Sequence, residues 1–479
     1  IMSIGSRKQS YWVHTSISLM LMLGFGFIPP ILGFTQMGMA LLGVLVGAVY
    51  GWITLEIAWP SLAGLLALAI WGYDSMNNIL KNSFGNSTVV MMLFILVFTM
   101  YMSRCGCMDA ITKWFISRKI IVGRPYVVLF VFYALGVILS FATSNIAAML
   151  FLISVAIPFC ENLGYKRKDK YPIALIFAIY LGTQCGLTVI PIKPPMLMMI
   201  SLIEAASGIT VDTATWILFF GALHIVALLV WIAVVRFLIR PEVDTFKNMT
   251  ENDFAEYRNI KIPTEAKIGF AAITIMMLFM LIPTFLPKAW AITAFCSKID
   301  IAGAILLVFV LIAIMPKEGS AKFNFQIVAN SEKMNWNVIL MTAFALTIAS
   351  ALSSDSTGFN ETINTYLVPL MSAFNPAVMI FVFSTILHFM TNILNNSAMS
   401  AIFINPMVAV ASALGMNLFF TPATAMVGMF DGLLSPAGTA SAPLLMGHEW
   451  MDMKEYYKNS FGIFAGFELF LLIAAVVLF

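Results

Sequence analysis

Apolar runs of about 20 residues recur along the whole sequence, and each is long enough to cross the hydrocarbon core of a bilayer as an α-helix. Hydrophobic residues make up 61% of the 479 residues and charged residues only 10%, whereas about 25% is usual in soluble domains. The apolar stretches are continuous rather than alternating, so they do not fit a transmembrane β-barrel. The sequence therefore predicts an all-α polytopic membrane protein with about 11 transmembrane helices.

The first apolar run, from Ile17 to Leu32, follows the basic residues Arg7 and Lys8. No small-residue cleavage pattern follows it and Pro29-Pro30 ends it, so we interpret it as a membrane helix rather than a signal peptide. The net charge of +3 gives no indication of nucleic-acid binding, because the basic residues lie in loops. We expect a multi-pass protein of the cell membrane with a cytoplasmic N-terminus.

Two polar triplets, Ser144-Asn145-Ile146 and Asn395-Asn396-Ser397, each interrupt a long apolar run. At membrane depth, irregular polar backbone is tolerated only inside protein or beside a water-filled cavity. The first triplet lies between two basic loops, residues 104–124 and 161–171, so the chain is expected to enter and leave on the cytoplasmic side. The apolar stretch between these loops is slightly short for two full spans of about 20 residues each. A re-entrant hairpin with the triplet at its tip is the simplest solution.

The second triplet lies between Lys333 and Lys454, a stretch without lysine or arginine, so its hairpin is expected to open to the outside. Each hairpin is followed by a broken helix, at residues 183–195 and 434–443, and Pro194-Pro195 is typical of a helix start. Two such interruptions with opposite openings predict an inverted-topology repeat. The expected division is N-terminal scaffold helices 1–75, a first repeat 76–240 with an inward-opening hairpin (tip 144–146), a cytoplasmic linker 241–267, and a second half 268–479 with an outward-opening hairpin (tip 395–397).

The tips and breaks favour an anion site with cations beside it. A helix N-terminus carries roughly +0.5 charge, and helices that resume after the tips and breaks aim several N-termini at one region. Carbonyls at the ends of the preceding helices, with Ser and Asn oxygens, suit a hard cation such as Na⁺. We expect the substrate to be bound by Ser144, Asn145, Ile146, Lys193, Pro194, Asn395, Asn396, Ser397 and Thr439. We expect Na⁺, the candidate coupling ion and the only cofactor indicated, to be held by Ser144, Asn145, Gly186, Asn396 and Gly438.

This arrangement resembles the divalent anion/sodium symporter family of the ion transporter superfamily, which has a Ser-Asn-Thr triplet at each of two hairpin tips and a Thr-Pro-Pro-type loop in each half. Phe84-Gly85-Asn86-Ser87, Arg240-Pro241-Glu242 and Asn335-Trp336 resemble further landmarks of that family. The resemblance implies a homodimer in membrane lipid, with a scaffold domain and a transport domain in each protomer. It also implies elevator-type movement of the transport domain, which carries dicarboxylates, citrate or sulfate with Na⁺ or in exchange.

The sequence departs from the family pattern at both tips, at Lys193 and in the second break, where Ala440 and Ser441 replace the two prolines. Ile146 removes the hydroxyl of the third tip position and Asn395 places an amide at the first, which favours a larger or less polar anion. Lys193 stands where the family has Thr, and a charge at the centre of a membrane helix costs about 2.5–3.5 kcal/mol and indicates function. Lys193 either supplies the positive charge that Na⁺ supplies elsewhere, pairs with a substrate carboxylate, or reaches the interface or a structural partner. We favour the first, which predicts anion exchange.

Two more polar residues lie in the apolar part of the second half. Asp431 either balances Lys193, ligates a cation or lies at the outer surface, and His388 is expected to form a hydrogen bond within the bundle. The sequence predicts a secondary active transporter of di- or tricarboxylate-like organic anions, working by Na⁺-coupled symport or by exchange. The alternative is a cation/proton antiporter of the same superfamily with Asp431 as proton carrier. We do not expect an enzyme, because HExxH, Gly-x-Ser-x-Gly and His-rich metal motifs are absent.

Overall fold

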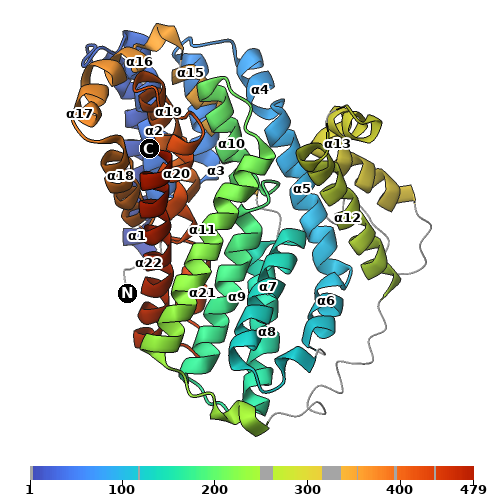
Figure 1. Cartoon of the computed structure of the whole chain (residues 1–479). Coiled ribbons are helices and arrows are strands. Elements are labelled where there is room, and N and C mark those ends of the chain that lie inside the picture. Colours follow the sequence, from blue (N-terminus) through green and yellow to red (C-terminus); the bar gives the residue numbers. More distant parts are fainter. Residues whose placement is uncertain are drawn as a thin grey trace.

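The described part of the chain is built from helices (Figure 1). The computed structural model describes residues 4–116, 119–248, 263–287, 289–314, 336–352, 354–392, 396–435 and 438–479. Within these ranges, seven helices are long and apolar enough to cross a membrane, and the number rises to ten when each of three bent helix pairs counts as one span. The all-α polytopic fold is thus confirmed.

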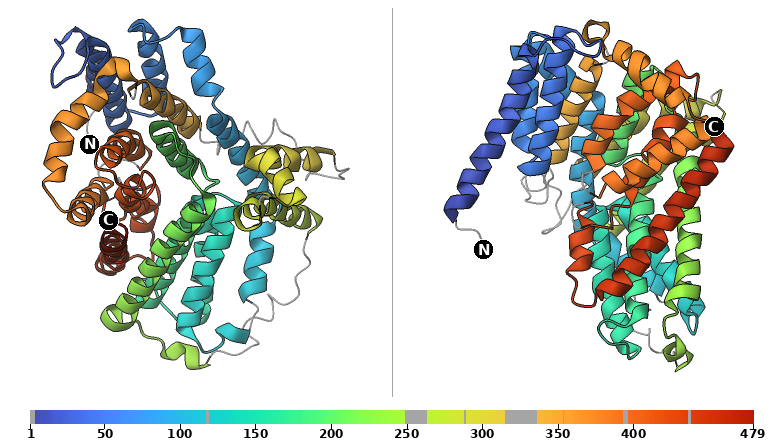
Figure 2. Two further views of the ribbon diagram at one scale, coloured as in Figure 1. Left: turned by 45° about the horizontal axis from the view of Figure 1, so that its top comes forward. Right: turned by 90° about the vertical axis from the view of Figure 1, so that its left-hand side faces the viewer.

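The first helices form a group at one side of the molecule, and α4 and α5 connect this group to the rest (Figure 2). Residues 84–87, singled out in the sequence, lie where α4 gives way to α5, which bends the chain by 48°. In chain order these elements are α1 (Ile4–Gly24), η1 (Phe25–Phe27), α2 (Gln36–Thr54), α3 (Ala58–Ile70), α4 (Met76–Phe84), α5 (Ser87–Arg104), α6 (Cys107–Ile116) and η2 (Lys119–Ile121).

The first polar triplet lies between two antiparallel helices of equal length. The elements of this part are α7 (Pro125–Ala142), α8 (Asn145–Asn162), α9 (Lys170–Thr188), α10 (Pro194–Ser207), α11 (Thr213–Val234), the π-helix η3 (Val235–Ile239) and η4 (Asp244–Asn248). Each arm of the α7–α8 hairpin has 18 residues, which is roughly 27 Å of helix. Both arms pack on α9, whose residues are almost all buried, so α9 is the central helix of this half.

The predicted break at residues 183–188 is wrong, because α9 continues to Thr188 and the break lies at Val189–Lys193. The reason is that Gly182 and Gly186 serve close packing rather than a turn. A Cβ atom at Gly182 would overlap the backbone of Tyr133 in α7, and one at Gly186 would overlap the carbonyl of Val137. The expected start of a helix at Pro194 is confirmed, with Pro194 and Pro195 in the first turn of α10.

The second half has the same order of a helical hairpin, a helical segment and a break. Its elements are α12 (Thr264–Phe285), α13 (Ala291–Ile314), α15 (Trp336–Leu352), η6 (Asp355–Thr357), α16 (Phe359–Thr362), the π-helix η7 (Ile363–Leu367), α17 (Val368–Ser372), α18 (Pro376–Met390), α19 (Asn396–Ala413), α20 (Phe420–Ala425), η8 (Val427–Phe430), α21 (Ser441–Met446) and α22 (Met453–Leu478). The expected linker therefore ends at Pro263, and its residues 249–262 lie outside the described residues, as do Lys317, Lys322 and Lys333. In the second half, the segment after the hairpin is formed by the short elements α20 and η8, whereas the first half has the long helix α9 there.

The two hairpins occupy opposite ends of the molecule. The α7–α8 pair lies in the lower half of Figure 1 and the α18–α19 pair in the upper half, and the second view agrees (Figure 2). Helix α9 leads to α10, and α20 with η8 leads to α21, so a helix break follows each hairpin. This placement is the one expected of hairpins that open to opposite sides of a membrane.

Capping residues and surface composition fit helices that stand in a bilayer. Ser144 caps α8 by accepting from the Ala147 amide, and Asn375 caps α18 by accepting from the Ala377 amide. The outer faces are apolar: Leu218 of α11 and Val477 of α22 are 69% and 72% exposed. Large apolar side chains on an outer surface are stable when lipid rather than water covers them.

Candidate transport site

Lys193 lies at the point where the first break meets the first hairpin. It is the residue before α10, its side chain is buried at 4% exposure, and its Nζ donates a hydrogen bond of 2.6 Å to the Thr143 carbonyl. Thr143 ends α7 and directly precedes the tip residue Ser144. The break and the tip, far apart in sequence, are thus joined by one charged hydrogen bond.

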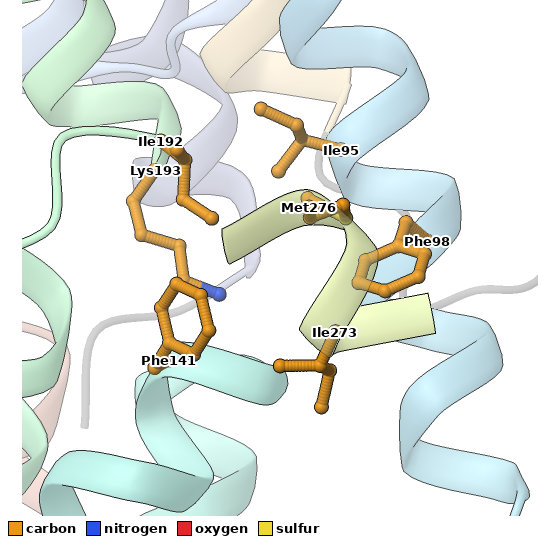
Figure 3. A pocket seen from close by; sticks show the side chains of 7 residues that line it. All are labelled: Ile95, Phe98, Phe141, Ile192, Lys193, Ile273 and Met276. Carbon is orange, nitrogen blue, oxygen red and sulfur yellow. The ribbon is translucent and has the colours of Figure 1, made fainter. Parts of the chain in front are cut away.

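The surroundings of the Lys193 side chain are otherwise apolar. It lines a pocket with the side chains of Ile95, Phe98, Phe141, Ile192, Ile273 and Met276 (Figure 3). These residues come from α5, α7, the first break and α12. An ammonium group in apolar surroundings is stabilised only by the partners it finds there, and within this pocket the partner is the backbone of the hairpin tip.

The side chains of the first tip remain accessible to a ligand. Ser144 is exposed, and Asn145 and Ile146, the first two residues of α8, are half-buried. The Thr143 hydroxyl, by contrast, is buried and donates to the Leu139 carbonyl at 2.7 Å, which closes the end of α7. The structure therefore brings Ser144 and Asn145 next to the residue that holds Lys193, as the sequence predicted. Gly186 lies one turn inside α9 instead of in a break.

The second tip can be followed from Asn396 onward, since Asn395 lies outside the described residues. Asn396 is the first residue of α19, is half-buried, and its Oδ1 accepts a hydrogen bond of 2.7 Å from the Thr391 hydroxyl. Ser397 follows it in the first turn of α19. The second tip therefore resembles the first in placing an Asn at the start of a helix.

The second break is longer than the first and begins earlier than the sequence predicted, at Asp431 instead of Leu434. Gly432 and Gly438 lie so close that a Cβ atom on either would overlap the backbone of the other. Thr439, half-buried, comes just before α21, and Pro436 and Ala437 lie outside the described residues. Asp431 is buried, which excludes the outer-surface alternative for this residue.

Asn392 ties the second break to the second hairpin, and the sequence analysis missed it. Its Oδ1 accepts from the Leu434 amide at 2.8 Å, and its Nδ2 donates to the His388 carbonyl at 3.1 Å. The Ser435 hydroxyl donates to the Asn392 carbonyl. The signal available in the sequence is an amide side chain directly after an apolar helix, a position at which Asn satisfies free backbone groups.

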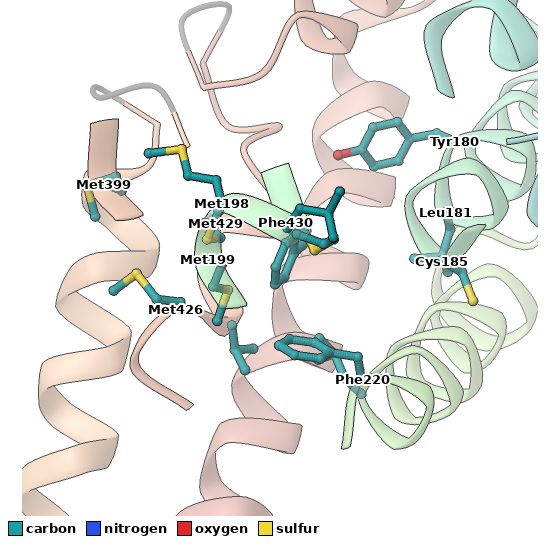
Figure 4. Packing of buried hydrophobic residues seen from close by; sticks show 14 of the residues in the cluster. Tyr180, Leu181, Cys185, Met198, Met199, Phe220, Met399, Met426, Met429 and Phe430 are labelled. Carbon is teal, nitrogen blue, oxygen red and sulfur yellow. The ribbon is translucent and has the colours of Figure 1, made fainter. Parts of the chain in front are cut away.

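The two halves meet across a surface rich in methionine. Helix α10 packs on α19, and Met198 and Met199 lie close to Met399, Met426 and Met429 (Figure 4). The Ser400 hydroxyl, one turn into α19, donates to the sulfur of Met429 at 3.4 Å. Because methionine is flexible and polarisable, it fills an irregular interface without fixing one arrangement. Met196–Met199 thus act as packing residues.

The arrangement suits an anion better than a metal ion in the first half. Among the described residues, His, Cys, Asp and Glu form no group of three or more that could hold a metal ion. The oxygens at the first tip suit Na⁺, but the Thr143 carbonyl already accepts from the Lys193 ammonium. Helix α8 begins two residues after Thr143 and α10 begins directly after Lys193, so two positive helix N-termini belong to the same region as the ammonium.

Comparisons with known proteins agree with this geometry. The sequence model of the citrate transporter family matches residues 48–429. The sodium-dependent dicarboxylate transporter SdcS of Staphylococcus saprophyticus is 22% identical over 442 residues, covering 89% of this chain and 83% of that protein. The YdaH transporter of Alcanivorax borkumensis has the same fold, with a TM-score of 0.52 and 13% identity over 86% of this chain and 88% of that structure. The family match includes both tips and the first break.

Proposed function

This chain belongs to the citrate transporter family, and we propose that it is a secondary active transporter that carries di- or tricarboxylate-like anions without Na⁺, by exchange. Membership confirms the resemblance to the divalent anion/sodium symporters and the prediction that the chain is not an enzyme. The multi-pass membrane location is likewise established. The observation that carries the proposal on coupling is the hydrogen bond from the buried Lys193 ammonium to the Thr143 carbonyl.

In this proposal Lys193 replaces a coupling cation. Its ammonium carries one positive charge to the carbonyl that ends α7, beside Ser144 and Asn145, where a coordinated Na⁺ would otherwise supply that charge. The anion then sits between the N-termini of α8, α10 and α19 and contacts Ser144, Asn145, Ile146, Pro194, Asn396, Ser397 and Thr439, with Asn395 as a further ligand. Ile146 adds apolar contact in place of a third-position hydroxyl.

Exchange follows because this cation is part of the protein. A bound Na⁺ leaves with the substrate, whereas Lys193 stays when the anion dissociates. The empty site then holds a desolvated cation without its anion, and moving it through the bilayer is costly. The carrier therefore crosses readily only when loaded, which is the definition of an exchanger. Symport with Na⁺, with Gly438 and Asn396 among the ligands, is the competing mechanism.

The topology and assembly belong to the same proposal. The basic residues Lys166, Arg167 and Lys168 lie at the end of α8, on the lower side of Figure 1, which we assign to the cytoplasm together with the N-terminus. Residues 1–75 act as scaffold, 76–240 and 268–479 as the two inverted halves, and 241–267 as the linker. We further propose elevator movement within a homodimer.

The test is uptake of labelled succinate and citrate into proteoliposomes that contain the purified protein. One set receives an inward Na⁺ gradient, and the other receives unlabelled anion inside and no Na⁺. We expect uptake in the second set, and we expect Lys193→Thr to lower it at least about tenfold without Na⁺ and to recover part of it with Na⁺. Lys166→Thr, a loss of an exposed lysine, is the matched control.

Three results would count against the proposal. Uptake that needs Na⁺ in the wild type would make the chain a symporter. Na⁺-indifferent uptake in Lys193→Thr would remove the role of Lys193. Collapse of a pH gradient on addition of Na⁺, with no anion uptake, would make the chain a cation/proton antiporter.

A further inference from the structure

Three titratable side chains from separate elements meet next to the second break. His388 of α18 lies between Glu468 of α22 and Asp431, the residue that ends η8. Its Nδ1 is 2.8 Å from Oε1 of Glu468, and its Nε2 is 3.6 Å from Oδ2 of Asp431. The Thr385 hydroxyl donates to the other oxygen of Glu468 at 2.7 Å. We call these three residues the His388 cluster.

Asp431 is the incompletely satisfied member of the cluster. It is 1% exposed, and neither carboxylate oxygen has a hydrogen-bond partner among the described residues. Its distance from Nε2 of His388 is slightly too long for a hydrogen bond. A buried carboxylate without donors is costly, so this geometry favours a proton on Asp431 or between Asp431 and His388.

Few other ionisable groups face the cluster. Tyr180 of α9 and Tyr456 of α22 interact electrostatically with Asp431. The His224 ring, like that of His388, contacts Phe467, and its Nε2 is hydrogen-bonded to the Thr188 hydroxyl at 2.6 Å. The segments Phe420–Ala425 and Val427–Phe430, which also pack on α18, contain no ionisable side chain.

The charge of the cluster depends on how many protons it holds. With one proton, on His388, two carboxylates leave one net negative charge, and a second proton makes the cluster neutral. In a low-dielectric interior, a change of nearby charge shifts the balance between these two states. Glu468 is 18% exposed and is the member through which a proton can reach the buried pair.

Hydrogen bonds and close packing connect the His388 cluster to the second break, which is part of the transport site. Asp431 begins the break that ends at Thr439, and Asn392 connects the carbonyl of His388 to the amide of Leu434 within that break. Gly428, in η8, contacts His388 so closely that a side chain at position 428 would overlap its Cβ. A ligand that rearranges the second break therefore acts directly on the surroundings of Asp431.

We propose that the His388 cluster is a proton-binding site that takes up a proton when the transport site binds its anion. The inference rests on the proposed anion exchange and names the ion that is bound together with the anion. The Lys193 ammonium already bonds the Thr143 carbonyl in the empty carrier, so we assign the proton that accompanies the anion to the cluster. The cluster can take up this proton, because a bound anion raises the negative potential nearby and favours the protonated state.

The sign of the pH dependence follows from this coupling. Binding that takes up a proton is favoured where protons are abundant, so anion affinity falls as pH rises through the range in which the empty carrier loses the proton. One coupled proton gives a loss of about tenfold in affinity for each pH unit in that range. Loss of the proton of the buried Lys193 ammonium would give a slope of the same sign, so the assignment to the His388 cluster depends on the loss of the slope in Asp431→Asn.

The experiment measures protons taken up when succinate or citrate binds to the purified wild-type protein. Binding heats are compared in buffers of different ionisation enthalpy, at a pH at which both probes are fully ionised. We expect about one proton per bound anion in the wild type. Asp431→Asn, which imitates the protonated acid, should still bind anion but take up no proton and lose the pH slope. Asp452→Asn, which changes a half-buried capping carboxylate away from the cluster and keeps an acceptor, should behave as the wild type.

The outcomes separate this inference from the function on which it rests. Absence of binding by both probes would contradict the proposed anion transport. Binding without proton uptake in the wild type, or proton uptake that persists in Asp431→Asn, would overturn the proton site alone. Where Asp431→Asn does not fold, Glu468→Gln, which keeps a hydrogen-bonding side chain beside Thr385 and His388, must reduce the proton uptake.

Discussion

The two helix breaks differ in how they are held, although they occupy corresponding places in the two halves. The first is short, follows a helix packed backbone to backbone on its hairpin, and ends at the buried Lys193. The second is longer, is held by side-chain hydrogen bonds from Asn392 and Tyr456, and begins at the buried acid Asp431. The two halves thus share the order of hairpin and break but differ in chemistry, with a buried lysine at one break and a buried carboxylate at the other.

The largest effect is expected from filling the close contact in the first half. Gly182→Leu places a side chain against the backbone of Tyr133, where no rotamer avoids overlap, so α7 and α9 must separate. Such overpacking costs several kcal/mol, and we expect no monodisperse protein in size-exclusion chromatography. Gly221→Ala is the control, because nothing lies within 4 Å of a Cβ atom there. A folded Gly182→Leu protein with normal transport would show that the first half is not held by this contact.

An intermediate effect is expected from the hydrogen bonds of the second half. Asn392→Ala removes one acceptor and one donor and leaves the Leu434 amide unpaired, at a cost of about 1–3 kcal/mol. We expect a lower melting temperature and roughly tenfold slower anion exchange, because the second break is no longer hydrogen-bonded to its hairpin and does not move together with it. Asn364→Ala, at an exposed position of η7, serves as the control. Exchange at the wild-type rate in Asn392→Ala would mean that tip and break do not need this connection.

The smallest effect is expected from Tyr456→Phe. The Tyr456 hydroxyl donates to the Leu433 carbonyl at 2.8 Å, so its removal takes away one hydrogen bond and leaves the ring packing in place. We expect a loss of about 1 kcal/mol in thermal unfolding and little change in transport rate. A change in the pH slope of anion binding as large as that of Asp431→Asn would instead place Tyr456 within the His388 cluster.

Local signals predicted most of the fold, and long-range packing accounts for the remainder. Apolar runs on either side of the polar triplets located the hairpin arms, and the proline pair located the start of α10. The end of α9 was missed because glycine is read as a helix breaker, whereas Gly182 and Gly186 allow two backbones to touch. The local sequence around a glycine does not predict such a contact, because the contacting residue lies on another helix.

The candidate site likewise contains some residues that the sequence identified and others that only the structure identifies. Lys193 was identified because a charged residue within an apolar stretch is unusual. Its hydrogen-bond partner, the Thr143 carbonyl, was missed because any residue can supply a backbone carbonyl. Glu468 was missed because its partner His388 is 80 positions earlier in the sequence. Chemistry carried by one residue is visible in a sequence, whereas chemistry carried by a contact between distant residues requires the structure.

The close contact of α7 with α9 also limits where the pathway can open. Two helices whose backbones touch leave no seam for water, and neither can slide along the other without lifting Gly182 and Gly186 off their neighbours. A gate on this side therefore cannot lie between them. The non-helical segments that remain on this side are the turn at Thr143–Ser144 and the segment Val189–Lys193, which the Lys193 hydrogen bond holds together. Any opening on this side would therefore have to break the same bond that brings Lys193 to the hairpin tip.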